Sequence, residues 1–137
     1  MKNKKLIIIA IAAAIVFIWG NSLLSREASQ LLSDSVQSGL IQISGGDTSG
    51  KVNSAVLRKV AHFCEFAALG GLWALLFREK KKGFFKAFLF SAACAALDET
   101  IQIFSNRGSS LSDVILDCFG AGFGVLVIFL FLTRKAK

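Results

Sequence analysis

The chain contains no proline, no tyrosine and only one histidine, and charged residues make up just 18% of its 137 positions. With 54% hydrophobic residues it is too apolar and too short for an ordinary soluble domain with a polar surface. A lone histidine without a thiol cluster also disfavours a transition-metal site, because such sites are built largely from imidazole and thiolate ligands. The composition therefore indicates a small integral membrane protein.

Cysteine is scarce and dispersed. Cys64, Cys94 and Cys118 each lie in an apolar segment and share no C-x-x-C spacing. We interpret them as small packing residues, so they do not indicate a redox compartment. Neither serine nor cysteine stands beside His62 in a nucleophile motif, which disfavours covalent catalysis.

Four apolar segments approach the length of about 20 residues that crosses a hydrocarbon core about 30 Å thick. A short chain of this kind can cross a bilayer only as helices, so the sequence predicts an all-α bundle of four transmembrane helices in a single domain, residues 1–137. Lysines precede the first segment as in a signal peptide, but no A-x-A-like cleavage site follows, and we expect a retained signal-anchor helix. The predicted spans are 6–24, 57–77, 84–104 and 111–132.

The distribution of charge predicts the orientation of these helices. Three basic residues precede the first segment, five lie around the turn between the second and third, and three follow the fourth, which makes 11 of the 16. The opposite side holds eight of the nine acidic residues. The positive-inside rule then makes both termini cytoplasmic and residues 25–56 an external loop. The net charge of +7 reflects this topology and does not indicate nucleic acid, because basic and aromatic residues are not interleaved outside the spans.

Two further patterns concern packing. In the external loop, apolar residues recur at helical spacing and predict a short amphipathic helix along the outer interface, with a partly ordered linker as the alternative. In the last span, Gly120 and Gly124 form a G-x-x-x-G motif, which marks a close helix contact within the chain or with a second copy of it. The loop residues at helical spacing are Leu24, Ala28, Leu31, Leu32 and Val36.

Six acidic or imidazole side chains are embedded in the predicted spans. On insertion scales a charge at the centre of a bilayer costs at least about 2.5 to 3.5 kcal/mol, so a group of this kind indicates a function. We call them the polar cluster: His62, Glu65, Asp98, Glu99, Asp113 and Asp117.

The topology brings the polar cluster to one depth. The outer ends of the last three spans are neighbours, and at about 1.5 Å per residue Glu65, Asp98 and Asp117 each lie about 9 to 10 Å below them. Each span carries one polar stripe at helical spacing, and the stripes must face inward or line water because facing lipid is prohibitive. We expect a polar cup that opens to the external surface, with Arg107 in the loop above it.

Three roles for this cup stay open. It could bind a charged ligand, it could act as an enzyme in which His62 and Asp98 or Glu99 exchange protons, or it could be a purely structural salt-bridge network. We predict no resident metal or other cofactor, although the carboxylates of the last two spans could hold Mg²⁺ or Ca²⁺. Asp98 and Glu99 are about 100° apart on their helix, so the sequence does not decide which faces the cup. The candidate ligand-binding residues are Arg58, Lys59, His62, Glu65, Asp98, Glu99, Gln102, Arg107, Asp113 and Asp117.

These residues carry a resemblance to the VanZ-like family of bacterial membrane proteins. Residues 58–72, RKVAHFCEFAALGGL, are similar to the family's R-K-x-A-H-F-x-E-[FY] and the small residues after it. Residues 98–124, DETIQIFSNRGSSLSDVILDCFGAGFG, resemble the family's D-E-x-x-Q-x-F, R-x-x-x-x-x-D-V and D-x-x-G. Order, spacing and chemistry agree over about half of the chain.

The resemblance implies a multi-pass protein of the bacterial plasma membrane, in a Gram-positive cell, that acts on the cell envelope. The family's namesake lowers susceptibility to teicoplanin far more than to vancomycin. Lipoglycopeptides carry an acyl chain that holds them at the outer leaflet, where the predicted cup opens. The expected partners are therefore membrane lipids and a lipid-linked cell-wall precursor or a lipoglycopeptide, with a homo-oligomer as a further option.

Overall fold

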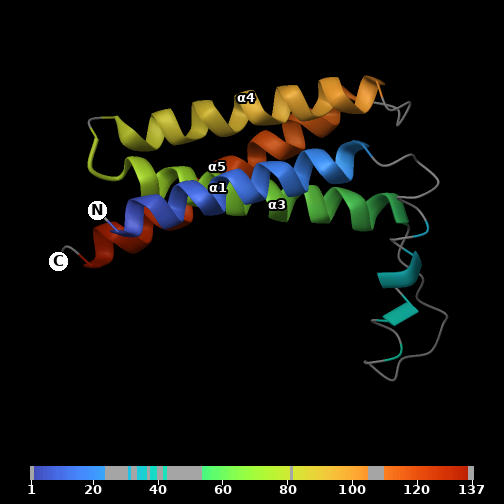
Figure 1. Cartoon of the computed structure of the whole chain (residues 1–137), viewed down its shortest axis with the longest axis horizontal. Coiled ribbons are helices and arrows are strands. Elements are labelled where there is room, and N and C mark those ends of the chain that lie inside the picture. Colours follow the sequence, from blue (N-terminus) through green and yellow to red (C-terminus); the bar gives the residue numbers. More distant parts are fainter. Residues whose placement is uncertain are drawn as a thin grey trace.

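The computed structural model describes residues 2–23, 31, 34–36, 38–39, 42, 54–80, 82–104 and 110–135. Within these ranges the chain is almost entirely helical and contains no strand. All four long helices have the length and composition to cross a membrane, so the predicted all-α fold with four membrane-spanning helices is confirmed. They are α1 (Lys2–Leu23), α3 (Ser54–Phe77), α4 (Gly83–Phe104) and α5 (Leu111–Lys135) (Figure 1).

The helices match the predicted spans and extend a few residues beyond some of them. α1 begins four residues before the predicted span, and α3 begins at Ser54 in place of residue 57. Hydropathy alone does not detect such polar end turns, because a helix can continue outside the hydrocarbon core. The amphipathic helix predicted around residues 24–36 falls mostly outside the described residues, and the single-domain organisation stays a prediction.

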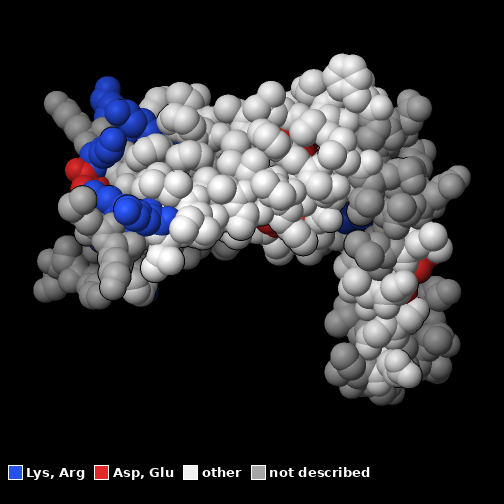
Figure 2. Space-filling view, viewed as in Figure 1, with Lys and Arg blue, Asp and Glu red and all other residues white. Residues whose placement is uncertain are grey.

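Both chain ends lie at the same end of the bundle, together with the turn between α3 and α4 (Figure 1). Lysine and arginine side chains gather at this end of the molecule, whereas the middle of the bundle surface is largely uncharged (Figure 2). This arrangement agrees with the charge distribution on which the topology was predicted. That this end faces the cytoplasm stays a prediction.

An ion pair joins the start of α1 to the α3–α4 turn at this basic end. The Lys4 Nζ atom lies 2.6 Å from Glu79 Oε2, and more than half of each side chain is exposed. The hydrogen bond and the charge of Lys4 hold the pKa of Glu79 below its ordinary value of 4.5. We expect NMR titration of the Glu79 carboxyl to show this lowered midpoint.

A Lys4→Ala variant should return the Glu79 pKa toward its ordinary value. A carboxyl whose pKa is lowered by folding stabilises the folded state above its unfolded pKa and loses that contribution as the pH falls through the folded value. The pair therefore contributes fully above about pH 4.5, the ordinary pKa of the carboxyl, and loses this contribution only as the pH falls further through the lowered pKa of Glu79. An unchanged Glu79 midpoint in Lys4→Ala would contradict the contact.

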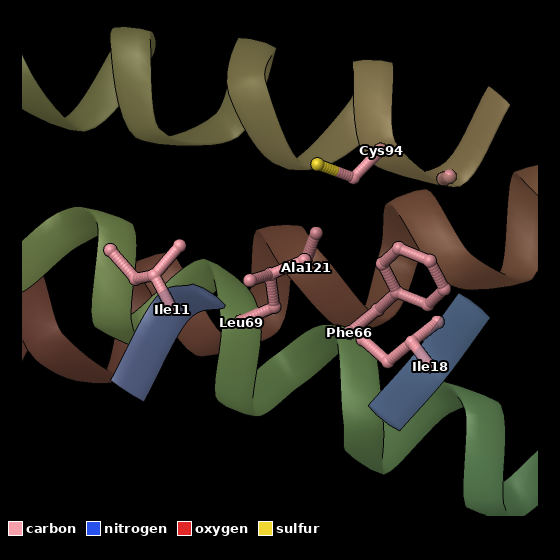
Figure 3. Close-up of a cluster of buried hydrophobic side chains, with 7 residues drawn as sticks. Ile11, Ile18, Phe66, Leu69, Cys94 and Ala121 are labelled. Atoms are coloured by element: carbon pink, nitrogen blue, oxygen red, sulfur yellow. The ribbon is translucent and has the colours of Figure 1, made fainter. Parts of the chain in front are cut away.

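Two apolar clusters lie between the helices in the described part of the chain, and the larger one joins α1 to the other helices. α1 contributes Ile11 and Ile18, which are two turns apart on one face and almost fully buried. They pack with Phe66 and Leu69 of α3 and with Ala121 of α5 in the cluster drawn in Figure 3. Most other large apolar side chains of the helices point outward, as expected where lipid is the solvent.

The closest approach in the bundle is between α3 and α5, and small residues permit it. A methyl group added at Gly124 would collide with the backbone carbonyl oxygen of Ala67, and one added at Gly120 would meet that of Phe63. Gly70 of α3 faces α5 in the same way. The G-x-x-x-G motif therefore makes its contact within the chain, and a homo-oligomer stays an untested prediction.

Candidate functional site

α3 places its polar residues on one stripe. Glu65 follows His62 by three residues, so the two side chains lie on the same face of the helix. The His62 Nδ1 atom is 3.7 Å from Glu65 Oε2. Arg58 lies one turn further out and is half-buried, and Lys59 beside it is exposed. The order of these residues along α3 is as the sequence predicted.

α4 brings a carboxylate and an amide into the centre of the bundle. Asp98 has 0% of its surface exposed. Gln102, one turn further along, donates a hydrogen bond of 2.7 Å from Nε2 to Asp98 Oδ2. Glu99 is also buried. Asp98 faces α3, because its Oδ2 atom lies 3.9 Å from His62 Nδ1.

α5 supplies two carboxylates with different surroundings. Ser110 precedes the helix, and its side-chain oxygen accepts a hydrogen bond from the Ser112 amide, as an N-cap does. Asp113 in the first turn is 2.8 Å from Lys59 Nζ at a partly exposed position. Asp117, one turn deeper, is 2% exposed. One carboxylate is therefore paired near the surface, and the other is enclosed.

α1 contributes two polar residues that the sequence did not predict as part of the site. Asn21 donates from Nδ2 to Glu65 Oε1 over 3.3 Å, and the Ser22 oxygen accepts from Gln102 Nε2 over 3.4 Å. Both residues lie in the last turn of α1, after the apolar stretch that begins at Leu6. Asn21 and Ser22 lie at the same depth in the predicted membrane as the polar cluster, and this depth is the sequence feature that could have identified them as part of the site. All four helices thus meet at one site, which we call the polar centre. Its residues are Asn21, Ser22, His62, Glu65, Asp98, Glu99, Gln102 and Asp117.

Three side chains from three helices converge at this centre. One ring nitrogen of His62 and one carboxylate oxygen each of Asp98 and Asp117 all lie within 4.8 Å of one another. Four further carboxyl groups are close enough to Asp117 to repel a negative charge there, namely Asp98, Asp113, Glu99 and Glu65. The centre is strongly acidic and combines one nitrogen donor with oxygen donors.

The salt-bridge network considered from the sequence is only partly present among the described residues. Lys59 neutralises Asp113, and His62 lies between Glu65 and Asp98. The Oδ1 atoms of Asp98 and Asp117 are buried and have no hydrogen-bond partner in the described part of the chain. Arg107 falls outside the described residues. Buried acceptors in this state are costly, so the arrangement is not what stability alone would select.

The centre is more enclosed than the expected open cup. His62 and Glu65 retain 15% and 18% of their side-chain surface, whereas Asp98 and Asp117 have almost none. On the face shown in Figure 2, acidic residues along the middle of the bundle appear only as small patches between uncharged residues. A ligand would therefore meet the site on the α3 side first. That these residues bind a ligand stays a prediction.

Comparison with known proteins gives one result. No curated protein and no solved structure matches the chain. The VanZ/LLP1 family model matches residues 6–132, which include all of α3 and α4, most of α1 and α5, and every residue of the polar centre. The chain therefore belongs to the VanZ/LLP1 family of membrane proteins.

Proposed function

We propose that this protein binds a charged component of the outer leaflet at its polar centre and thereby lowers susceptibility to teicoplanin-type glycopeptides. The ligand would be a lipid-linked phosphate precursor or an anionic lipid head. The location would be the plasma membrane of a Gram-positive bacterium. The observation that carries the proposal is a buried polar centre built from four helices, in a bundle that also has an apolar groove lined by α3, α4 and α5.

The groove supports a ligand with a hydrocarbon chain. It has a volume of about 650 Å³ and is lined almost entirely by apolar side chains of α3, α4 and α5. Phe63, Val114 and Cys118 line it, and each directly follows a member of the polar cluster in the sequence. The groove and the polar cluster thus share turns of α3 and α5, and we propose that one amphiphile places its charged end at the centre and its chain in the groove.

Basic groups near the outer end supply contacts for an anionic head. The Arg58 Nε atom is buried without a hydrogen-bond partner among the described residues, so its N–H is available to a phosphate oxygen. Lys59 lies beside Arg58 in the sequence. We propose that Arg107, between α4 and α5 in the sequence, also contacts the phosphate. Asp98, Glu99 and Gln102 would then hydrogen-bond hydroxyl or amine groups of the head.

A second candidate is an intramembrane enzyme that modifies or hydrolyses a lipid-linked substrate. The contacts of His62 with Glu65 and Asp98, 3.7 and 3.9 Å, favour this reading because they place an imidazole between two carboxylates. Such a group can accept and return a proton, with Asp98 or Glu99 as its partner. Turnover of a lipid-linked substrate by the purified protein would separate this candidate from simple binding.

The proposed function predicts a selective resistance phenotype. We expect a Gram-positive host that expresses the wild-type chain to become less susceptible to teicoplanin, with little change for vancomycin. An Asp98→Asn, Glu99→Gln variant at the same membrane level should give no protection, because neutral amides replace the two carboxylates proposed to hold the ligand. The measurement is the ratio of the two minimal inhibitory concentrations.

A Glu79→Gln variant is the matched control, because it removes a carboxylate at the opposite end of the bundle, and it should protect like the wild type. Equal protection by the double variant and the wild type would contradict a role for the centre. No protection by the wild type would contradict the resistance role itself.

A further inference from the structure

The three converging side chains form a donor set that suits a divalent metal ion. His62, Asp98 and Asp117 come from α3, α4 and α5, and their donor atoms lie within 4.8 Å of one another. Ligand atoms about 2.1 Å from a common ion are at most about 4.2 Å apart. Small side-chain rotations are therefore enough to bring these atoms around one ion.

Unused acceptors point to the same place. Asp98 and Asp117 are 0% and 2% exposed, and each has a buried Oδ1 atom without a hydrogen-bond partner among the described residues. An enclosed carboxylate oxygen in this state is normally paired with a cation or bound to a metal. Lys59 is already paired with Asp113 nearer the surface. A dication between Asp98 and Asp117 would satisfy both oxygens and offset the mutual repulsion of the acids.

The surrounding hydrogen bonds resemble the outer shell of a metal site. Gln102 donates to Asp98 and also contacts Ser22, which ties this carboxylate to α1. Glu65 lies beside the His62 ring and accepts a hydrogen bond from Asn21. Donors that orient a ligating carboxylate, as Gln102 does for Asp98, are part of the usual second layer of such sites, whereas Glu65 approaches the same ring nitrogen, Nδ1, as Asp98 does. Asn21 and Ser22, at the end of α1, would thus support the metal site through Glu65 and Gln102.

We infer that His62, Asp98 and Asp117 bind one divalent transition-metal ion, Mn²⁺ or Zn²⁺, at the polar centre. One imidazole with two carboxylates suits these ions, whereas Mg²⁺ and Ca²⁺ prefer oxygen ligands alone. A transition-metal site was not predicted from the sequence, because the chain has a single histidine. The alternative considered there, a Mg²⁺ or Ca²⁺ site made of carboxylates, did not include His62. Three protein ligands leave positions open, and one of them can take an oxygen of a phosphate head.

The test uses the metal alone. The full chain, stripped with EDTA in detergent micelles, is titrated with Mn²⁺, and free Mn²⁺ is followed by electron paramagnetic resonance. We expect one ion per chain. Pulsed measurements on the wild-type complex should detect coupling to a histidine ¹⁴N nucleus, a readout that needs no variant to fold.

Variants then assign the ligands. Asp117→Asn and His62→Ala should each weaken Mn²⁺ binding by at least about 100-fold, and Gln102→Leu, as a positioning residue, by about 10- to 100-fold. Glu79→Gln, a carboxylate outside the centre, should bind as the wild type does. Zn²⁺ should displace Mn²⁺, whereas Ca²⁺ at equal concentration should not.

Absence of stoichiometric binding by the wild type, or unchanged affinity in Asp117→Asn, would overturn the inference. Bound Mn²⁺ without nitrogen coupling would remove His62 from the site. Because no antibiotic or lipid takes part, the result is independent of the proposed function. A protein that binds metal but gives no protection would refute only the latter.

Discussion

A single methyl group at Gly124 is expected to separate α3 from α5. The added carbon would collide with the backbone carbonyl oxygen of Ala67, and a backbone cannot rotate away as a side chain can. Overpacking of this kind costs about 1 to 3 kcal/mol, which corresponds to a fall in Tm of roughly 4 to 12 °C for Gly124→Ala. The fall in Tm is measured by thermal unfolding of the purified protein in detergent, monitored by circular dichroism.

Gly122, two residues away on the same helix, is the matched control. A methyl group there would meet the Phe88 ring at 3.6 Å, which is ordinary van der Waals contact. Gly122→Ala should be neutral or stabilise the helix by up to about 1 kcal/mol, since alanine is the better helix former. Equal losses in both variants would contradict the collision with Ala67 as the cause, because helix propensity favours alanine at both positions and only Gly124 meets a backbone carbonyl.

The same comparison shows why the fold was predictable and one of its contacts was not. Four apolar segments of the right length permit only four helices, so element number and type follow from hydropathy alone. A G-x-x-x-G motif marks a close contact but carries no information about the partner. Only the placement of Ala67 opposite Gly124 shows that the partner is α3 of the same chain.

The polar centre was predictable to a similar degree. Charges in apolar segments identify its acids and His62, and helical rise places them at one depth. Two features of the centre could not be predicted from residue spacing, because they depend on how the helices pack against one another. Asn21 and Ser22 contribute because α1 packs beside α3 and α4. That Asp98 faces His62 depends on the rotation of α4 relative to α3.

The second large effect expected is an Asp117→Asn protein that is more stable and yet gives no protection. Asp117 is 2% exposed, it is surrounded by other carboxylates, and the described residues offer its Oδ1 atom no hydrogen bond. In EDTA, a neutral amide in place of this enclosed carboxyl removes its repulsion with the neighbouring acids and should stabilise the bundle by about 1 kcal/mol, a rise in Tm of roughly 4 °C. A purely structural network predicts the opposite sign, a loss of about 3 to 5 kcal/mol.

Asp113→Asn is the control for the direction of this change in stability. Asp113 lies one turn away on the same helix, but its carboxylate is partly exposed and paired with Lys59 at 2.8 Å. Its removal should therefore lower stability slightly, by at most about 1 kcal/mol. A rise in Tm for Asp117→Asn, a small fall for Asp113→Asn and loss of teicoplanin protection in Asp117→Asn would together identify Asp117 as a residue retained for function at the expense of stability. A large fall in the Tm of Asp117→Asn would instead mean that the acids of the polar centre hold the four helices together.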